Sequence, residues 1–374
     1  MIYTGLSPAT GRPIDVHVES GRIMAVSPSS ALGTKLWIAP GLIDLQVNGY
    51  AGVDYNSPDA PFDEIARSID TQRSCGVTRL FPTVITGSKE NMCGSLRNLA
   101  KAKSRLSEGV SLEAFHVEGP WISADDGPRG AHPKEHVRPA AIEEWRHFQD
   151  AAEGQIRLLT VAPEQQGVLP LIQQVCAEGV VVSIGHTNAT TSQIEDAIHA
   201  GATMSTHLGN GSHKELPRFP NYIWDQLAAD ELYASLIVDG IHLPQAFVKV
   251  ALRAKGLDRT ILVTDAVAPA GCAPGIYRLG HLEVELLPEN RVQLTTTGRL
   301  AGSALRMDRA VETFLRFTDL SLPEALMTAT VNPGQALRIE GRQGFLEAGE
   351  RADLILFRFD PGTKAIQIEQ IVVA

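Results

Sequence analysis

Eight apolar, β-branched runs alternate with longer amphipathic stretches through the middle of the chain, and this alternation constrains the fold more than any other feature. The runs lie at residues 42–46, 77–85, 112–118, 157–163, 180–186, 202–208, 234–239 and 260–265. Continuous apolar runs are typical of strands buried on both faces, and the stretches between them are typical of the helices of βα units. Eight such units predict a (β/α)8 barrel with insertions, a fold that typically has about 250 residues or more.

The positions of the polar residues favour the barrel over a doubly wound open sheet, which is the alternative. Six polar side chains lie at or just beyond the carboxyl ends of the apolar runs: Asn48, Glu118, His186, His207, His242 and Asp265. A barrel spreads its functional residues over the carboxyl ends of many strands, whereas an open sheet gathers them at one switch point. We therefore expect these side chains to surround one site.

Both ends of the chain carry short alternating segments in place of βα units. Such segments lie at 14–18 and 22–26 near the start and at 352–357 and 365–368 near the end, bounded by turn-forming residues. The two ends are expected to pair. The prediction is an α/β, TIM-like barrel over residues 40–344 and a small β-sandwich domain built from residues 1–39 and 345–374.

Composition and charge exclude several classes of protein. The 374 residues are 44% hydrophobic and 20% charged, which is ordinary for a globular protein and excludes disorder. The net charge is -10 and long Lys/Arg runs are absent, which argues against nucleic-acid binding. The start lacks the pattern of a leader, and no apolar run has bilayer length. The four cysteines form no CxxC motif. We expect a soluble, cytoplasmic protein that uses no membrane and no nucleic acid.

Three potential metal ligands come from three different strands: Glu118, His186 and His207. Three N/O ligands that leave one position open are typical of a catalytic metal site. A single histidine at a strand end is more often a hydrogen-bonded core residue, but the three together favour a metal. His116 shares the face of Glu118 because strands have a period of two, and we interpret it as an interior residue or a partner that orients a ligand.

Asp265 ends the last apolar run and is the candidate general base, although a helix N-cap is the alternative role for an aspartate there. Arg218 is a candidate for bidentate recognition of a phosphate or carboxylate, and a solvated surface arginine is the ordinary alternative. Loops after strands supply the other candidates for substrate contacts: Ala131, His132, Asn210, Gly211, His242, Leu300, Ala301 and Gly302. Signatures of dinucleotide-binding, P-loop and serine-hydrolase sites are absent from the sequence.

Five ordered motifs resemble the N-acetylglucosamine-6-phosphate deacetylases of the amidohydrolase superfamily. They are PGLIDLQVNG at 40–49, HVEGP at 116–120, GHT at 185–187, THL at 206–208 and VTDA at 263–266. The resemblance implies that Glu118, His186 and His207 bind one divalent metal, expected to be zinc, with iron as the alternative. It also implies that Asp265 activates the attacking water. Many superfamily members carry a His-x-His pair where this chain has Gln46 and Asn48, and because amides are poor ligands a single-metal site is implied.

The resemblance further implies the roles of the substrate-binding residues. His132 would polarise the acetyl carbonyl, and His242, Asn210 and Gly211 would hold the sugar. Arg218 stands where the family has an arginine that reaches the phosphate in the neighbouring subunit, so a homodimer is implied. The predicted reaction is hydrolysis of the linear amide of N-acetylglucosamine 6-phosphate to glucosamine 6-phosphate and acetate.

The segment at 209–221 departs from the family pattern, which has Asn-Ala-Met and later Arg-Glu-Pro-Gly after the second histidine. This departure leaves open another N-acyl amino sugar, possibly without a phosphate, or a cyclic amide as the substrate. A barrel that serves as a non-catalytic scaffold is the third alternative, because fold alone does not establish activity.

Overall fold

Eight parallel strands form a barrel, and their positions match the eight apolar runs. The computed structural model describes residues 1–31, 33–279 and 282–374. The strands are β5 (Leu42–Val47), β8 (Val77–Ile85), β9 (Phe115–Glu118), β10 (Ile156–Val161), β11 (Val181–Ile184), β12 (Met204–Ser205), β13 (Tyr233–Leu236) and β14 (Thr260–Leu262). They pair in this order. After β14 the chain returns to β5, because Val47 and Ala266 form a parallel bridge and the Asp265 amide donates to the Gln46 carbonyl at 2.8 Å. The predicted barrel is confirmed.

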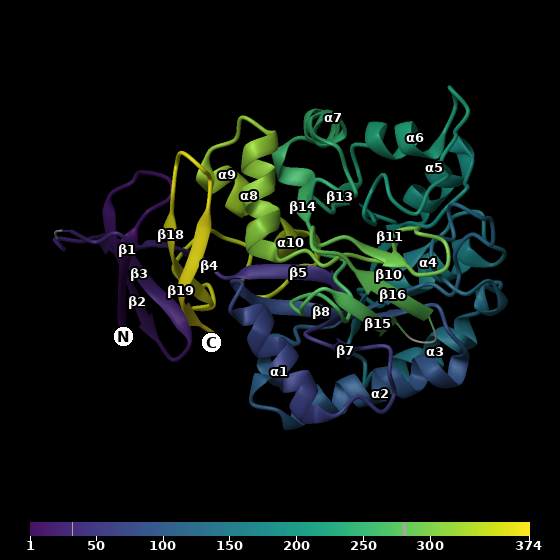
Figure 1. Ribbon diagram of the computed structural model, residues 1–374, viewed down its shortest axis with the longest axis horizontal. Coiled ribbons are helices and arrows are strands. Elements are labelled where there is room, and N and C mark those ends of the chain that lie inside the picture. The colour runs from purple at the N-terminus through teal and green to yellow at the C-terminus, as the bar shows by residue number, and fades with distance from the viewer. Residues whose placement is uncertain (32, 280–281) are drawn as a thin grey trace.

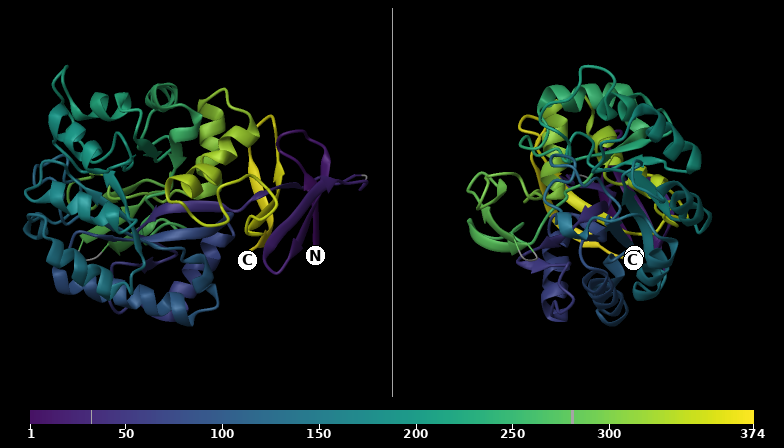
Figure 2. Two further views of the ribbon diagram at one scale, coloured as in Figure 1. Left: turned by 180° about the vertical axis from the view of Figure 1, so that it is seen from behind. Right: turned by 90° about the vertical axis from the view of Figure 1, so that its right-hand side faces the viewer.

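Helices cover the outside of the barrel (Figure 2). They are α1 (Phe62–Arg73), α2 (Lys89–Arg105), α3 (Ile142–Ala151), α4 (Val168–Ala177), α5 (Thr191–Ala200), α6 (Tyr222–Ala228), α7 (Gln245–Lys255), α8 (Met307–Phe317), α9 (Leu322–Met327) and α10 (Val331–Ala336), with short 3-10 helices at Glu108–Ser111, Lys134–His136 and Leu257–Arg259. The start of α5 shows how local sequence sets a boundary. Thr190 accepts a hydrogen bond from the Gln193 amide while the Gln193 side chain accepts one from the Thr190 amide, which is a capping box.

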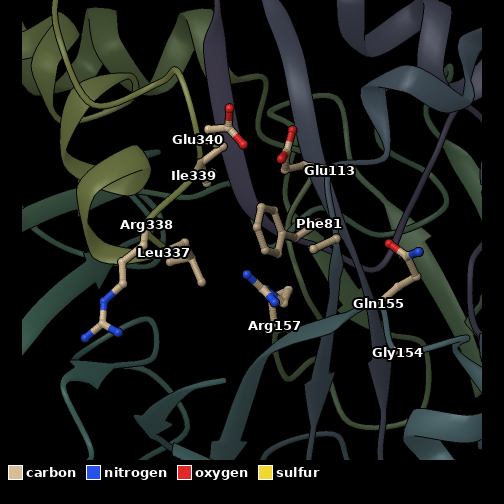
Figure 3. Close-up of a pocket in the computed structure, with 10 residues that line it drawn as sticks. Phe81, Glu113, Gly154, Gln155, Arg157, Leu337, Arg338, Ile339 and Glu340 are labelled. Atoms are coloured by element: carbon tan, nitrogen blue, oxygen red, sulfur yellow. The ribbon is translucent and has the colours of Figure 1, made fainter. Parts of the chain in front are cut away.

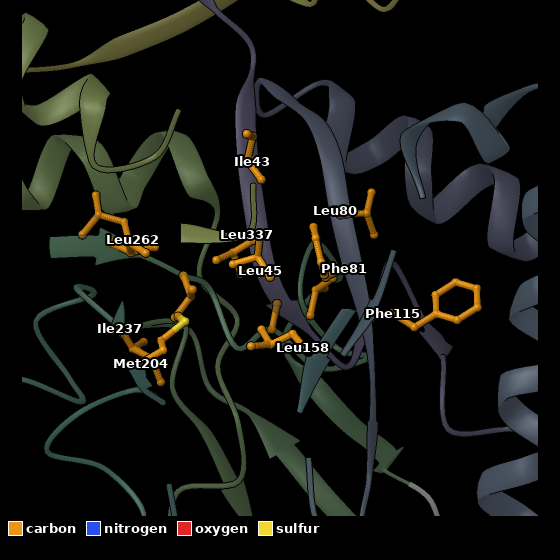
Figure 4. Packing of buried hydrophobic residues seen from close by; sticks show 14 of the residues in the cluster. Ile43, Leu45, Leu80, Phe81, Phe115, Leu158, Met204, Ile237, Leu262 and Leu337 are labelled. Atoms are coloured by element: carbon orange, nitrogen blue, oxygen red, sulfur yellow. The ribbon is translucent and has the colours of Figure 1, made fainter. Parts of the chain in front are cut away.

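The core is formed by apolar side chains from successive strands (Figure 4). Ile43 and Leu45 of β5, Leu158 of β10, Met204 of β12 and Leu262 of β14 are each at most 2% exposed. Burial of side chains of this size stabilises the fold by about 1.5–3 kcal/mol each. The barrel is therefore a packed core rather than a pore, and its functional side chains are expected at the carboxyl ends of the strands.

A six-stranded sheet lies beside the barrel and carries both chain termini (Figure 1). Its order is β19-β18-β4-β1-β2-β3, with β1 (Ile2–Leu6), β2 (Pro13–Glu19), β3 (Arg22–Pro28), β4 (Trp37–Pro40), β18 (Leu354–Phe359) and β19 (Ile366–Val372). The two chain ends pair through β4, which is parallel to β1 and antiparallel to β18. This confirms the predicted fold class, while the exact domain boundaries at 39 and 345 stay a prediction.

A buried ion cluster joins this sheet to the barrel. Asp353, which is fully buried just before β18, accepts hydrogen bonds from Arg79 of β8 at 2.8 Å and from Arg342 at 2.7 Å. Both arginines are 3% exposed. Since neither guanidinium can be solvated there, the position of Asp353 is tightly specified.

Two smaller sheets were not predicted. A hairpin of β6 (Gly49–Tyr50) and β7 (Val53–Asp54) follows β5, and β15 (Gly275–Leu279), β16 (Leu282–Leu286) and β17 (Val292–Leu294) form an antiparallel sheet after β14. The latter projects from the body of the molecule (Figure 2). Among the described residues, no helix is both long enough and apolar enough to cross a membrane.

Candidate active site

Glu118, His186 and His207 converge at the carboxyl end of the barrel. Their potential ligand atoms all lie within 4.8 Å of one another, and all three side chains are buried. The Glu118 Oε1 atom lies 3.1 Å from Nε2 of His186 and 3.0 Å from Nε2 of His207. Although burial opposes it, the two imidazoles hold the pKa of Glu118 well below its ordinary value. A charged carboxylate and two imidazoles therefore face a common point, as a metal ion requires.

The loops after β9 and β11 fix the orientation of His186. Its Nδ1 lies 2.7 Å from the carbonyl oxygen of Pro128, which accepts a hydrogen bond from that nitrogen in the tautomer that leaves Nε2 free to bind a metal. His186, His207 and Asp265 all have positive φ, at 51°, 31° and 50°. Left-handed backbone is unfavourable for such residues and is found where surrounding structure holds functional side chains in place.

Gln46 and Asn48, on and just after β5, donate hydrogen bonds to the acidic groups of the site. The Gln46 Nε2 atom donates to Glu118 Oε1 at 2.9 Å, and Asn48 Nδ2 donates to Asp265 Oδ1 at 2.7 Å. Amide groups at these two positions therefore orient carboxylates, while a site for only one metal stays a prediction.

Asp265 is partly buried at the same end of the barrel, just beyond β14. Burial, followed by the negative charge of Glu118, raises the pKa of Asp265 to about 6. A carboxyl group with a pKa near 6 is suited to take up and return a proton near neutral pH.

His132 completes the inner part of the site. Its ring lies 4.3 Å from that of His186, and its Nδ1 lies 2.8 Å from Thr86 Oγ1. Burial, followed by repulsion from His186, lowers the pKa of His132 to about 3, so the ring is neutral. His116 lies deeper, with Nε2 at 2.7 Å from Thr160 Oγ1, and is not part of the ligand group, as predicted.

A cavity of about 970 Å³ at the carboxyl end of the barrel is lined by Asn48, Glu118, His132, His186, His207 and Asp265. Most candidates for substrate contact line it as well: Ala131, His132, Asn210, Gly211, His242, Leu300 and Gly302. His242 is held in place by Asp239, whose Oδ2 lies 2.6 Å from its Nδ1. Two candidates do not line the cavity: Ala301 is buried, and Arg218 is exposed on the surface.

Several cavity residues were missed by sequence reasoning. They are Arg129, Lys134, Lys214, Arg291 and Arg299, together with His213, whose Nδ1 lies 3.0 Å from the Tyr222 hydroxyl. They belong to loops, where no periodicity marks which side chains turn inward. The available signal was their positive charge, because five Lys and Arg residues in these loops stand out in a chain with a net charge of -10.

A second cavity of about 240 Å³ lies near the beginning of β9 and β10, away from this site (Figure 3). Phe81, Glu113, Arg157 and Arg338 are among its lining residues. Since it contains none of the candidate residues, it is not the active-site candidate.

The comparisons with known proteins agree with the geometry. The Amidohydrolase family model matches residues 37–373. The N-acetylglucosamine-6-phosphate deacetylase of Bacillus subtilis is 33% identical over 326 residues, which cover 86% of this chain and 81% of the relative. The N-acetylgalactosamine-6-phosphate deacetylase of Escherichia coli O157:H7 is 31% identical over 357 residues, which cover 94% and 92%.

Solved structures give the same result. The N-acetyl-D-glucosamine-6-phosphate deacetylase of Mycobacterium smegmatis superposes with a TM-score of 0.90 at 29% identity, covering 100% of this chain and 98% of that one. A mutant of the same enzyme in complex with N-acetyl-D-glucosamine-6-phosphate gives a TM-score of 0.87 at 30% identity, covering 97% and 95%.

Proposed function

The chain belongs to the amidohydrolase family and, within it, to the N-acetylglucosamine-6-phosphate deacetylases, and from this premise we propose that it converts N-acetylglucosamine 6-phosphate into glucosamine 6-phosphate and acetate. The observation that carries the proposal is the convergence of Glu118, His186 and His207 beside Asp265 in one cavity. Three potential metal ligands beside a carboxyl group of raised pKa are suited to metal-dependent amide hydrolysis.

One divalent metal ion, zinc or iron, would be held by Glu118 Oε1 and the Nε2 atoms of His186 and His207. The residues fit such an ion, because the three atoms converge and the hydrogen bond at His186 Nδ1 leaves Nε2 free. When bound, the ion supplies Lewis acidity that favours deprotonation of water and polarises the acetyl oxygen.

Asp265 is proposed to act first as a base and then as an acid. It takes a proton from the attacking water, whose oxygen forms the new bond to the acetyl carbon. The bond from that carbon to nitrogen then breaks, and Asp265 gives the proton to the departing amine, so that acetate and the amino sugar are released. Asn48 fixes the carboxyl group for both steps through its 2.7 Å bond to Oδ1.

His132 is proposed to stabilise the acetyl oxygen as negative charge develops on it. The Nδ1 atom of His132 is hydrogen-bonded to Thr86, and its Nε2 atom lies 3.9 Å from Glu118 Oε2, on the side of the three proposed metal ligands. A donor held in advance at this place stabilises the transition state more than the substrate. Ala131, Asn210, Gly211, His242, Leu300 and Gly302 are proposed to enclose the sugar.

Two further expectations stay proposals. A homodimer is proposed on the family resemblance, with exposed Arg218 on the surface that meets the second copy, and a cytoplasmic location is proposed with it. The galacto epimer of the substrate is a second candidate, because the N-acetylgalactosamine-6-phosphate deacetylase is as similar to this chain as several of the gluco-specific relatives.

The experiment is a substrate panel with metal-reconstituted protein. We expect release of acetate from N-acetylglucosamine 6-phosphate, and a lower rate or none with the galacto epimer, with unphosphorylated N-acetylglucosamine and with cyclic amides. Metal content measured on the same sample separates an enzyme from a scaffold. Faster hydrolysis of the unphosphorylated sugar, or protein that binds no metal, would overturn the proposal.

A further inference from the structure

The cavity of about 240 Å³ near the beginning of β9 and β10 lies at the amino-terminal end of the barrel, opposite the candidate active site. Part of its lining is apolar, with Phe81, Ala114, Leu337 and Ile339 (Figure 3). At about 30 Å³ for each water-sized group, it has room for about eight non-hydrogen atoms. The cavity therefore matches a small organic molecule in size.

Four charged side chains also line this cavity, and the two carboxylates among them already have partners. Glu113 Oε2 accepts a hydrogen bond from Arg351 Nη2 at 2.8 Å, and Glu340 Oε1 accepts one from Arg22 Nη2 at 3.1 Å. Neither partner arginine lines the cavity itself. The negative charges of the lining are therefore neutralised from outside it.

The other two charged residues, Arg157 and Arg338, have no such partners. Both are exposed, and neither side chain makes a hydrogen bond or an ion pair with any residue that the structure describes. The lining thus carries two guanidinium groups whose charge no carboxylate balances. Positive charge that is left unbalanced around a cavity attracts an anionic ligand.

The backbone is irregular at both arginines. In the pairing of β10 with β9 the register shifts between Ile156 and Leu158, so Arg157 is the extra residue of a bulge, a device that redirects a side chain. Arg338 follows the residue that ends α10 and has a φ of +51°, at a position where helices usually have glycine. An arginine held in left-handed backbone is a feature found at ligand-binding sites.

We propose that this cavity binds a short aliphatic dicarboxylate, with one carboxylate on Arg157 and the other on Arg338. The fork of N–H donors of a guanidinium group matches the two oxygens of a carboxylate. In the view of Figure 3, Leu337 lies between the two arginine side chains, where the methylene groups of the ligand would pack. An inorganic anion would leave this apolar part of the lining uncovered, so the dicarboxylate is favoured.

The inference does not rest on the proposed deacetylase function, because the site shares no residue with the active-site cavity. The ligand would join β10 to the segment that follows α10. A ligand that binds only the folded state stabilises it by mass action, so binding should also raise the unfolding temperature.

The test uses succinate as the probe and measures its binding by calorimetry at low ionic strength. We expect a dissociation constant of about 1 mM, which is reasonable for a ligand of this size. Butyrate has the same chain length but one carboxylate, and it should bind about tenfold more weakly because one guanidinium group stays unpaired. Inorganic phosphate should also bind more weakly than succinate.

Two variants locate the site. Arg157→Gln and Arg338→Gly should each weaken succinate binding about tenfold, at the low end for a hydrogen bond to a charged group because both arginines are exposed. Arg338→Gly also relieves the left-handed backbone, so without ligand it should unfold at the same temperature as the unaltered protein or higher. Arg146→Gln, at an exposed position on α3, is the matched control and should bind succinate normally.

Unchanged succinate binding in either Arg157→Gln or Arg338→Gly would overturn the inference. Butyrate or phosphate that binds as tightly as succinate would also overturn it, because the ligand would then not be a dicarboxylate. Acetate release from N-acetylglucosamine 6-phosphate is measured on the same samples and should be unchanged in all three variants. That assay reports on the proposed function alone, so the two proposals can fail separately.

Discussion

Gly211 is packed against a proposed metal ligand, and adding one methyl group there tests the site directly. A Cβ atom at Gly211 would lie 2.7 Å from Nδ1 and 2.9 Å from Cε1 of His186. These distances are too short, and Nδ1 is already held at 2.7 Å from the Pro128 carbonyl. In Gly211→Ala the imidazole or the loop at residue 211 must therefore shift. We expect the imidazole to move, so that its Nε2 leaves the point that it shares with Glu118 and His207.

Two effects contribute and can be separated. Gly211 has a φ of +54°, so alanine there costs about 1–2 kcal/mol of stability from backbone strain alone. The displaced imidazole adds a loss of metal affinity of about 10- to 100-fold, which is typical when the support of a ligand is disturbed. Gly11→Ala is the matched control, because Gly11 has a φ of +67° and a Cβ atom there meets nothing within 4 Å.

Zinc affinity is measured by competition with a chelator, and stability by denaturant unfolding of the metal-free proteins. Both variants should lose stability, but only Gly211→Ala should lose zinc affinity and, with it, deacetylase activity. Gly211→Ala protein that binds zinc as tightly as Gly11→Ala would refute the assignment of His186 as a ligand in this geometry.

Three further predictions concern single carboxyl groups. Asp265→Asn should lower turnover by about 10²- to 10⁴-fold, because the amide cannot take up a proton, while the zinc content of the purified protein stays the same; near-normal turnover would reject the base. Asp353→Asn should lower the free energy of unfolding by about 3–5 kcal/mol, because Arg79 and Arg342 stay buried without their partner; a loss below about 1 kcal/mol in urea unfolding would contradict this. Burial raises the pKa of Asp44 from 3.8 to about 7, so the folded protein keeps a proton that the unfolded chain releases. The resulting contribution to stability is present at low pH and is lost as pH rises toward 7. The free energy of unfolding falls by about 4 kcal/mol at most over this pH range, and in Asp44→Asn it should not fall in this way. Identical profiles of unfolding free energy against pH for the two proteins would argue against a protonated Asp44.

The periodicity of the sequence was sufficient to predict the barrel. Buried parallel strands carry continuous apolar runs, and these runs can be recognised in the sequence without knowledge of any contact. The residues at the ends of those runs could then be assigned to one site, because the carboxyl ends of parallel strands meet at one end of a barrel. Glu118, His186 and His207 were found in this way, and so was Asp265.

Only the tertiary structure showed which loop residues join them. Arg291 and Arg299 lie far from Glu118 in sequence, on either side of β17 in a small sheet that was not predicted, and only folding brings them to the same cavity. It also separated Leu300 and Gly302, which line the cavity, from Ala301 between them, which does not. Strand ends follow from a repeating pattern of burial, whereas the direction of a loop side chain depends on packing between segments that are distant in the chain.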